Sequence, residues 1–266
     1  MPHRNPESPL VLAVSNQKGG EGKTTTAVNL AASLAAAERR VLLVDLDPQC
    51  NASSSVGFPR GAVDTGTYDL LLGQATVDAL VRETPLENLH VLPATADLAG
   101  AEVELVQLED RATLLRSALE QSSTRYDFVI LDCPPSLGLL TLNALVAAKS
   151  VLIPMQAKYF SLEGLSALSE IIERVREALN PGLHIQGILF CLFDPRTNLA
   201  QQVVSEVETH FEGLVFKTRI PQNIRLSESP SHGLPAILYD IESKGAQAYL
   251  ALARELLESL EQESTY

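Results

Sequence analysis

Gln17-Lys18-Gly19-Gly20-Glu21-Gly22-Lys23-Thr24-Thr25-Thr26 is the stretch of the sequence that decides the fold. The apolar run before it, residues 10–14, is typical of a buried parallel strand. Residues 27–35 follow it and are rich in strong helix formers. Strand, glycine-rich loop and helix are the setting in which this pattern predicts a phosphate-binding P-loop.

The residue types of the loop suit a bound nucleotide. The glycines allow tight turns that point backbone N–H groups at phosphate oxygens, and the following helix N-terminus adds partial positive charge. We expect Lys23 to reach the β- and γ-phosphates and the hydroxyl of Thr24 to bind Mg²⁺. The alternative, a glycine-rich turn that contains a lysine by chance, would not need a strand before it and a helix after it. The predicted nucleotide-binding residues of the loop are Lys18, Gly19, Gly20, Glu21, Gly22, Lys23, Thr24 and Thr25.

A second lysine, Lys18, stands at the start of the loop. A cation there lies at the rim of the phosphate site, where it is poorly placed to serve its own nucleotide. It could instead neutralise charge on a nucleotide bound by a facing subunit, as an arginine finger does.

The pattern Lys-Gly-Gly-x-Gly-Lys-Thr resembles the deviant Walker A motif of the ParA, MinD and nitrogenase iron-protein class. The resemblance implies that ATP, ADP and Mg²⁺ are the cofactors. It also implies an ATP-dependent homodimer in which Lys18 crosses to the partner's nucleotide and takes part in catalysis.

Two further strands are expected to end in carboxylates. Val41 to Val44 leads into Asp45 and Asp47, and a second apolar run ends at Asp132. Ligands of open α/β sheets gather at the carboxyl ends of strands, although such aspartates can also simply cap a turn. Asp132, followed by a double proline, matches a Walker B strand whose acid holds Mg²⁺ directly or through water. By the resemblance, Asp47 orients the attacking water and Asp45 supports the metal region with Thr24.

Composition limits the function classes. The 266 residues are 45% apolar, enough for one core, and we expect a single domain over residues 10–262 with a disordered tail over residues 1–9. No run approaches the roughly 20 apolar residues of a membrane span. Three isolated cysteines suit a reduced cytoplasmic protein. A net charge of −13 excludes a globally basic nucleic-acid binder and leaves room for a local basic stripe.

The rest of the chain alternates between strand and helix patterns. A regular alternation predicts a doubly wound, mainly parallel sheet with helices on both faces, the α/β architecture of P-loop NTPases. Residues 51–66 are expected to form a loop, and Ser161 to be the N-cap of a long helix. Further strands are expected at 89–93, 150–154, 185–193 and 215–220, and helices at 68–72, 94–108, 111–121, 139–148, 161–179, 201–211 and 243–261.

The resemblance narrows to the chromosomal ParA/Soj partitioning ATPases and covers residues 12 to about 257. Its most specific stretch is Ile220-Pro221-Gln222-Asn223-Ile224-Arg225-Leu226-Ser227-Glu228-Ser229-Pro230-Ser231-His232-Gly233. It implies that Pro221 and Asn223 lie near the adenine, and that Arg196 and Arg225 contact DNA phosphates. Lys217 and Arg219, on the strand expected at 215–220, are further candidate cations. Alternatively, Arg196 and Arg225 pair with local acids such as Asp194 and Glu228.

Four positions depart from the family pattern. Glu21 stands where the family usually has a small apolar residue, and Gln222 stands where it often has an arginine. Lys158 stands where it often has an acid, and Cys50 where it often has a glycine. A carboxylate at residue 21 is repelled by phosphate, so we expect the side chain of Glu21 to point to solvent or to pair with a cation such as a facing subunit's lysine.

These observations predict a cytoplasmic, nucleoid-associated ATPase that dimerises on ATP, binds double-stranded DNA non-specifically and segregates a replicon with a ParB-like protein. One alternative is a MinD-like ATPase at a membrane surface. The acidic C-terminal residues 255–263 argue against this, so no membrane partner is expected. The other is an iron–sulfur reductase, which needs cysteines that share a cluster across a dimer.

Overall fold

The structure, a computed structural model, describes residues 9–263. The disordered tail expected over residues 1–9 falls on residues 1–8, which lie outside the described residues.

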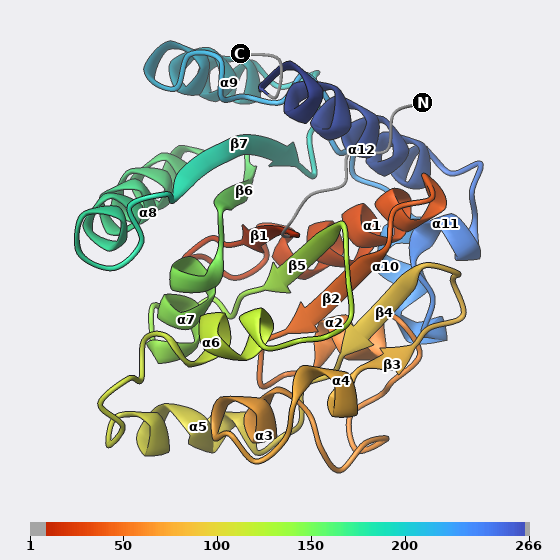
Figure 1. Cartoon of the computed structure of the whole chain (residues 1–266). Helices are drawn as coiled ribbons and strands as arrows, with labels where there is room; N and C mark the ends of the chain where they lie inside the picture. The colour runs from red at the N-terminus through yellow and green to blue at the C-terminus, as the bar shows by residue number, and fades with distance from the viewer. Residues whose placement is uncertain (1–8, 264–266) are drawn as a thin grey trace.

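A seven-stranded sheet in the order β3-β4-β2-β5-β1-β6-β7 forms the centre of the fold (Figure 1). Every pairing is parallel except that of β3 with β4, which is antiparallel. The doubly wound α/β architecture predicted from the sequence is therefore confirmed. The strands are β1 (Leu10–Val14), β2 (Val41–Asp45), β3 (Arg82–Glu83), β4 (Leu89–Leu92), β5 (Phe128–Asp132), β6 (Ser150–Gln156) and β7 (His184–Cys191).

Helices cover both faces of the sheet (Figure 1). One face packs against α1 (Lys23–Ala36), α10 (Ile224–Glu228), α11 (Ala236–Tyr239) and α12 (Lys244–Glu263). The other packs against α3 (Thr67–Leu71), α4 (Val77–Leu80), α5 (Leu98–Leu105), α6 (Leu114–Glu120), α7 (Leu139–Ala147), α8 (Tyr159–Ala178) and α9 (Asn198–His210). The short helices α2 (Asn51–Ser54) and η1 (Ser229–His232) complete the described elements.

Alternating side chains of the strands supply two apolar layers. In β1, Leu12 and Val14 join the layer of α1 and α12, whereas Ala13 faces the layer of α7 and α8. All three side chains are fully buried, as expected for a strand covered on both faces. The position of β1 between β5 and β6 places the loop that follows it at the middle of the sheet.

The strand expected at residues 215–220 is wrong. Isolated bridges, Val215 with Ile188 and Pro221 with Phe193, and hydrogen bonds such as Ile220 N to Phe190 O at 2.9 Å join this segment to β7 and the residues after it without a continuous ladder. The backbone N–H groups of residues 217 and 218 instead donate to the carboxylate of Glu255 on α12, at 2.6 and 2.9 Å. A side-chain acceptor thus satisfies donors that a sheet ladder would otherwise use.

Two other expectations about local structure need correction. Residues 51–66 are not all loop, because α2 forms at Asn51–Ser54. The long helix α8 begins at Tyr159, with Lys158 as its N-cap, so Ser161 is not the N-cap. The hydroxyl of Ser161 donates to Glu21 of the phosphate loop instead.

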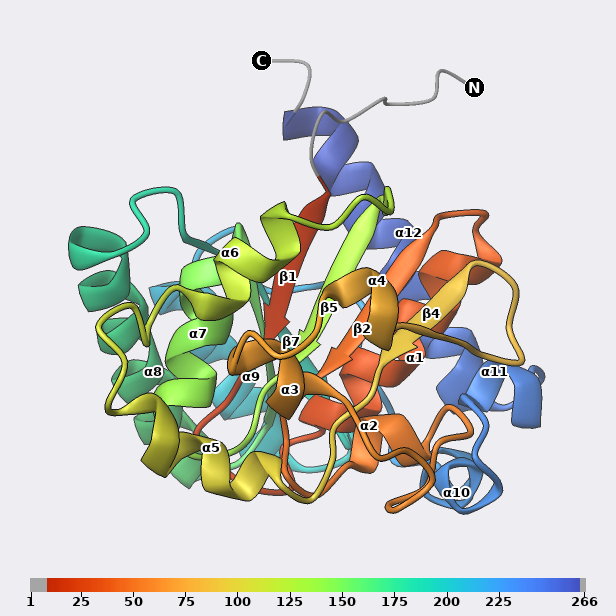
Figure 2. The same cartoon turned by 60° about the horizontal axis from the view of Figure 1, so that its bottom comes forward.

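The parallel strands carry their carboxyl ends to one edge, where the arrowheads of β1, β2 and β5 point the same way in Figure 2. Asp45 and Asp132 are register partners at the ends of β2 and β5, and Val14, the last residue of β1, pairs with Asp132. Segments far apart in the sequence therefore meet where α1 begins.

Candidate functional site

The phosphate loop turns from β1 into α1 through two glycines in the left-handed region, Gly20 (φ 76°) and Gly22 (φ 92°). Gly22 is the N-cap of α1, and its carbonyl accepts from Thr26 N at 2.8 Å. A Cβ on Gly22 would lie 3.2 Å from the Cβ and Sγ of Cys191 on β7. Both the backbone angle and this close approach therefore require glycine at residue 22.

Lys23 is buried inside the loop that it follows. Its Nζ donates to the carbonyl oxygen of Lys18 at 2.6 Å, closing the loop into a ring. Burial lowers the pKa of Lys23, while Asp132, Cys133, Asp47 and Glu21 oppose the shift. A phosphate in this ring would replace a neutral carbonyl acceptor with a charged one, which strengthens hydrogen bonds to an ammonium group.

The predicted metal-site acids differ in their hydrogen bonding. Asp45 is fully buried and accepts from Asp47 N at 3.0 Å, Ser53 N at 2.8 Å and Ser53 Oγ at 2.6 Å. Both oxygens of Asp132 are buried and make no well-formed hydrogen bond among residues 9–263, although the Thr24 hydroxyl lies close enough to lower the pKa of this carboxyl. Asp45 thus orders the segment between β2 and α2, and Asp132 keeps its oxygens available.

Burial is the largest cause of the pKa shifts of this pair. It raises the pKa of Asp45 to about 6 against the hydrogen bonds of Ser53. Burial and the neighbouring Asp45 raise the pKa of Asp132 well above its usual value, while Thr24 and Lys23 oppose the shift. An orphaned carboxylate beside a P-loop threonine fits a hydrated Mg²⁺ ion, because its oxygens can accept from metal-bound water.

Asp47 lies beyond Asp45 in the same segment and is 7% exposed. Its Oδ1 accepts from Gln49 N at 2.9 Å, which fixes the side chain in the turn that leads to α2. Cys50, the N-cap of α2, has φ 58°, a left-handed backbone conformation that favours glycine.

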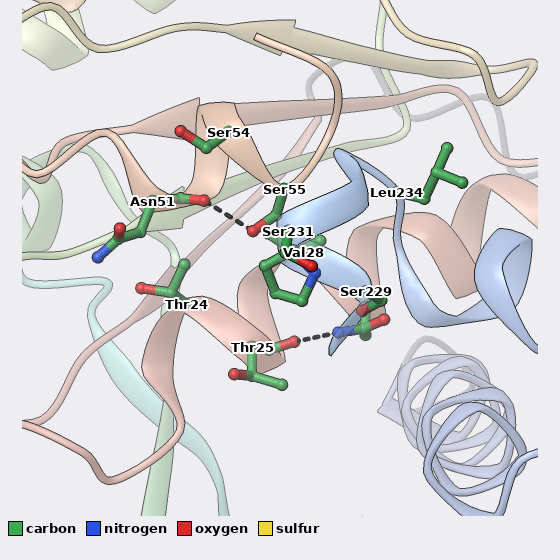
Figure 3. A pocket seen from close by; sticks show the side chains of 11 residues that line it. Thr24, Thr25, Val28, Asn51, Ser54, Ser55, Ser229, Ser231 and Leu234 are labelled. Carbon is green, nitrogen blue, oxygen red and sulfur yellow. Dashed lines mark hydrogen bonds between the residues drawn. The ribbon is translucent and has the colours of Figure 1, made fainter. Parts of the chain in front are cut away.

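A cavity of about 410 Å³ opens beside the start of α1 (Figure 3). Its polar groups come from α1, α2 and η1, three elements that sequence reasoning did not connect. The serines of α2 and η1 were missed because serine-rich stretches are typical of loops, although the run of serines that follows Asn51 was a usable signal. The cavity is lined by Thr24, Thr25, Val28, Asn29, Asn51, Ser54, Ser55, Ser229, Pro230, Ser231 and Leu234.

Pro221 and Asn223, which are predicted to lie near the adenine, are outside this cavity. Pro221 bridges to Phe193, just beyond the end of β7. Asn223 is the N-cap of α10, and its side chain accepts from Arg225 N at 3.0 Å.

Lys18 points away from Lys23 and toward the start of α8. Its Nζ donates to the carbonyl oxygen of Phe160 and lies 5.6 Å from the centre of the Phe160 ring. Its methylene groups pass beside Gly164, where a Cβ would lie 3.5 Å from Lys18 Cε.

Glu21 corrects the expectation of a solvent-facing or cation-paired carboxylate. The residue is only 5% exposed. It accepts from Gln156 N and from Ser161 Oγ, both at the junction of β6 and α8. Hydrogen bonds within the chain, rather than water or a facing lysine, therefore satisfy this carboxylate.

The predicted DNA contacts occupy exposed ion pairs. Arg196 binds Asp194 through two nitrogens at 2.9 and 2.7 Å. Arg225 contacts Glu228 at 2.9 Å and Asp240 at 3.1 Å. These are the pairs with local acids that the sequence left open as the alternative. Exposed pairs of this kind stabilise a protein by only about 0–1 kcal/mol, so a phosphate can compete for the arginines.

The two remaining candidate cations differ in accessibility. The side chain of Arg219 is 22% exposed, binds Glu208 at 2.8 Å and lies 5.0 Å from the Phe190 ring centre. Lys217 is exposed. Lys217 is therefore better placed than Arg219 to meet a large polyanion.

Comparison with known proteins identifies the family. A family model described as an AAA domain matches residues 10–185. The chromosome partitioning protein ParA of Myxococcus xanthus is 56% identical over 93% of this chain and 87% of its own length. The sporulation initiation inhibitor protein Soj of Bacillus subtilis is 53% identical over 92% of this chain and 97% of its own length. The chain belongs to the ParA/Soj family of chromosome-partitioning ATPases.

Solved structures agree with this family assignment. The cobyrinic acid a,c-diamide synthase of Mycobacterium smegmatis, solved with ADP and magnesium, is 38% identical with a TM-score of 0.83 and covers 95% of this chain and 96% of its own. The septum site-determining protein MinD of Pyrococcus horikoshii, complexed with Mg-ADP, is 26% identical with a TM-score of 0.76, covering 93% and 96% of the two chains.

Two further observations concern membrane spans and cysteines within residues 9–263. No helix of this part of the chain is long and apolar enough to cross a membrane. Cys50, Cys133 and Cys191 are all buried, so none stands at the surface where a cluster shared between subunits would need it. Burial also raises the pKa of Cys191 to about 12, which disfavours the thiolate that ligates iron.

The orphaned carboxylate of Asp132 generates a prediction about stability. We expect Asp132→Asn to raise the thermal unfolding midpoint of the nucleotide-free protein at pH 7, because burial disfavours the charged form of Asp132 and asparagine carries no charge. The pKa of Asp132 is raised in the folded state. Asp132 therefore lowers the free energy of unfolding as the pH rises above the pKa that its carboxyl group has in the unfolded chain. The gain should therefore shrink toward pH 4, by up to about 1.36 kcal/mol per pH unit. Calorimetry of both proteins between pH 4 and 7 measures this, and an equal or larger gain at pH 4 would contradict it.

Proposed function

We propose that this protein is an ATP-dependent switch that dimerises on binding ATP, binds DNA non-specifically and hydrolyses ATP to segregate replicated DNA. The observation that carries the proposal is the pairing of a lysine-closed phosphate loop with the orphaned carboxylate of Asp132 at one sheet edge. These groups suit a triphosphate with its magnesium ion and match the ATPase names of the relatives.

Within the site, each residue has a proposed role. Lys23 and the N–H groups of residues 19–25 bind phosphate oxygens. Thr24 and Asp132 would hold Mg²⁺, while Asp45 keeps the β2–α2 segment in place. Mg²⁺, when bound, neutralises charge on the phosphates. Asp47 is assigned the role of orienting the attacking water.

Dimerisation is supported by apolar side chains at the nucleotide edge. Tyr159 is 62% exposed, Phe160 68% and Ile224 69%. An ATP-bound partner facing this edge would cover such side chains and receive Lys18 at its nucleotide. That transfer requires Lys18 to leave the carbonyl of Phe160.

DNA binding and the cellular role are inferred from the relatives' names and the exposed arginines. An ATP dimer would place two sets of Arg196, Lys217 and Arg225 on one assembly, so local cations can meet phosphates despite the acidic net charge. We place the protein in the cytoplasm on the nucleoid, with a ParB-like protein as its partner.

The two loop lysines should respond differently to removal. Lys23→Ala should weaken ATP binding roughly 10- to 100-fold, because each charge-assisted hydrogen bond contributes about 1.5–3 kcal/mol. Lys18→Ala should retain ATP affinity and lose ATP-dependent dimerisation. Equilibrium dialysis with ATP and sedimentation velocity measure both, and an equal affinity loss in the two variants would exclude the trans role of Lys18.

Asp47→Ala should give a stable ATP-bound dimer with little hydrolysis, since only the water-orienting group is removed. Phosphate release and sedimentation should be compared with Asp64→Ala, which removes an exposed acid from the loop after α2. Turnover as fast as that of the parent protein would assign Asp47 a structural role.

DNA binding should require ATP and fall steeply with salt. Arg196→Glu and Arg225→Glu should each weaken it without affecting dimerisation, and removing one phosphate-binding cation should flatten the log–log salt slope by about 0.9. Arg176→Glu is the matched control, because Arg176 pairs with Glu173 along α8 in another exposed ion pair. Undiminished DNA affinity in the Arg196 and Arg225 double variant would place the DNA surface elsewhere.

A further inference from the structure

Glu21 belongs to the phosphate loop by sequence and to the start of α8 by its contacts. Its two carboxylate oxygens accept from Ser161 Oγ, at 3.1 Å, and from Gln156 N. With 5% exposure, the carboxylate has little access to water. The hydrogen bonds therefore supply most of the solvation that a buried charge needs.

The N-terminus of α8 lacks its own negative group. The helix has 20 residues, its N-cap Lys158 makes no side-chain cap bond, and its first turn contains no acidic residue. A carboxylate near a helix N-terminus is stabilised by the helix dipole and in turn stabilises the helix. Glu21 supplies that charge from a segment about 140 residues earlier in the chain.

Three other contacts tie the same two segments together. Gln156 Nε2 donates to Gly20 O at 2.8 Å, and Asn16 Nδ2 donates to Pro154 O at 2.7 Å. Lys18 Nζ donates to the carbonyl of Phe160, in the first turn of α8. The loop that receives the phosphates and the turn that holds Lys18 thus form one hydrogen-bonded unit.

We propose that Glu21 is a positioning residue that joins the phosphate loop to the first turn of α8. Through this junction, the structural effect of nucleotide binding in the loop is transmitted to the turn that holds Lys18. The inference rests on the proposed function for its nucleotide. Glu21 does not touch the reacting atoms in this role. It acts through Ser161 and the backbone of Gln156.

The junction itself can be tested without nucleotide by a double-mutant cycle in urea. Glu21→Val and Ser161→Ala should each lower the unfolding midpoint, because each leaves a buried polar group without its partner. The double variant should unfold no earlier than the worse single variant, since both partners of one hydrogen bond are then apolar. Ser166→Ala is the matched control, because the Ser166 hydroxyl bonds only within α8, to Leu162 O at 3.2 Å. Its effect should add to that of Glu21→Val.

Transmission to α8 needs a readout that stability alone does not change. The chain contains no tryptophan, so Phe160→Trp introduces a single reporter at an exposed position beside Lys18. At a protein concentration where sedimentation shows only monomer, so that a partner does not cover residue 160, saturating Mg-ATP should change the emission of this reporter. Adding Glu21→Val should reduce the amplitude at least about threefold at an ATP concentration where dialysis shows full occupancy.

The outcomes separate the two proposals. Additive losses in the urea cycle, or an unchanged emission amplitude at full ATP occupancy, would overturn the role of Glu21. A parent protein that binds no ATP would overturn the proposed function. In that case the urea cycle still decides whether Glu21 joins the two segments.

Discussion

Parallel pairing of β2, β5 and β1 forces two carboxylates into a dry edge of the sheet. Asp45 and Asp132 are register partners there, and both are fully buried. Ser53 and the backbone of Asp47 satisfy one acid, and nothing in the described chain satisfies the other. This arrangement destabilises the ligand-free protein. A ligand that supplies positive charge relieves this cost, which favours its binding. The phosphate loop, which the hydrogen bond from Lys23 Nζ to Lys18 O closes, and α2 both lie at this edge of the sheet.

The sequence predicted the large elements well because their signals are local. The apolar runs of the sheet and the glycine loop before α1 leave few alternatives once they alternate with helical patterns. The sequence did not predict that residues 217 and 218 donate to Glu255, because such an acceptor comes from a helix almost 40 residues later. The strand propensity of that segment was overridden by a side chain outside it.

The site shows the same division between local and distant information. Spacing predicted that Lys23, Thr24, Asp45 and Asp132 would lie near one sheet edge, since each follows a strand or a glycine loop. The orientation of Glu21 was mispredicted. Repulsion by phosphate excludes some orientations of the carboxylate, but it does not identify the hydrogen-bond donors that the carboxylate contacts. Those donors lie about 140 residues away. Lys158, the N-cap of α8, lies between the two residues that donate to Glu21.

Burial of the three thiols bears on redox chemistry. Cys191 borders Gly22 and lies 3.6 Å from Thr26 Oγ1, inside the machinery that holds phosphate. A reactive thiolate there would make nucleotide binding respond to peroxide. With the pKa of Cys191 near 12, almost no thiolate exists at neutral pH, and 2% exposure denies oxidants access. Burial and the raised pKa therefore both disfavour oxidation of Cys191 in the folded protein.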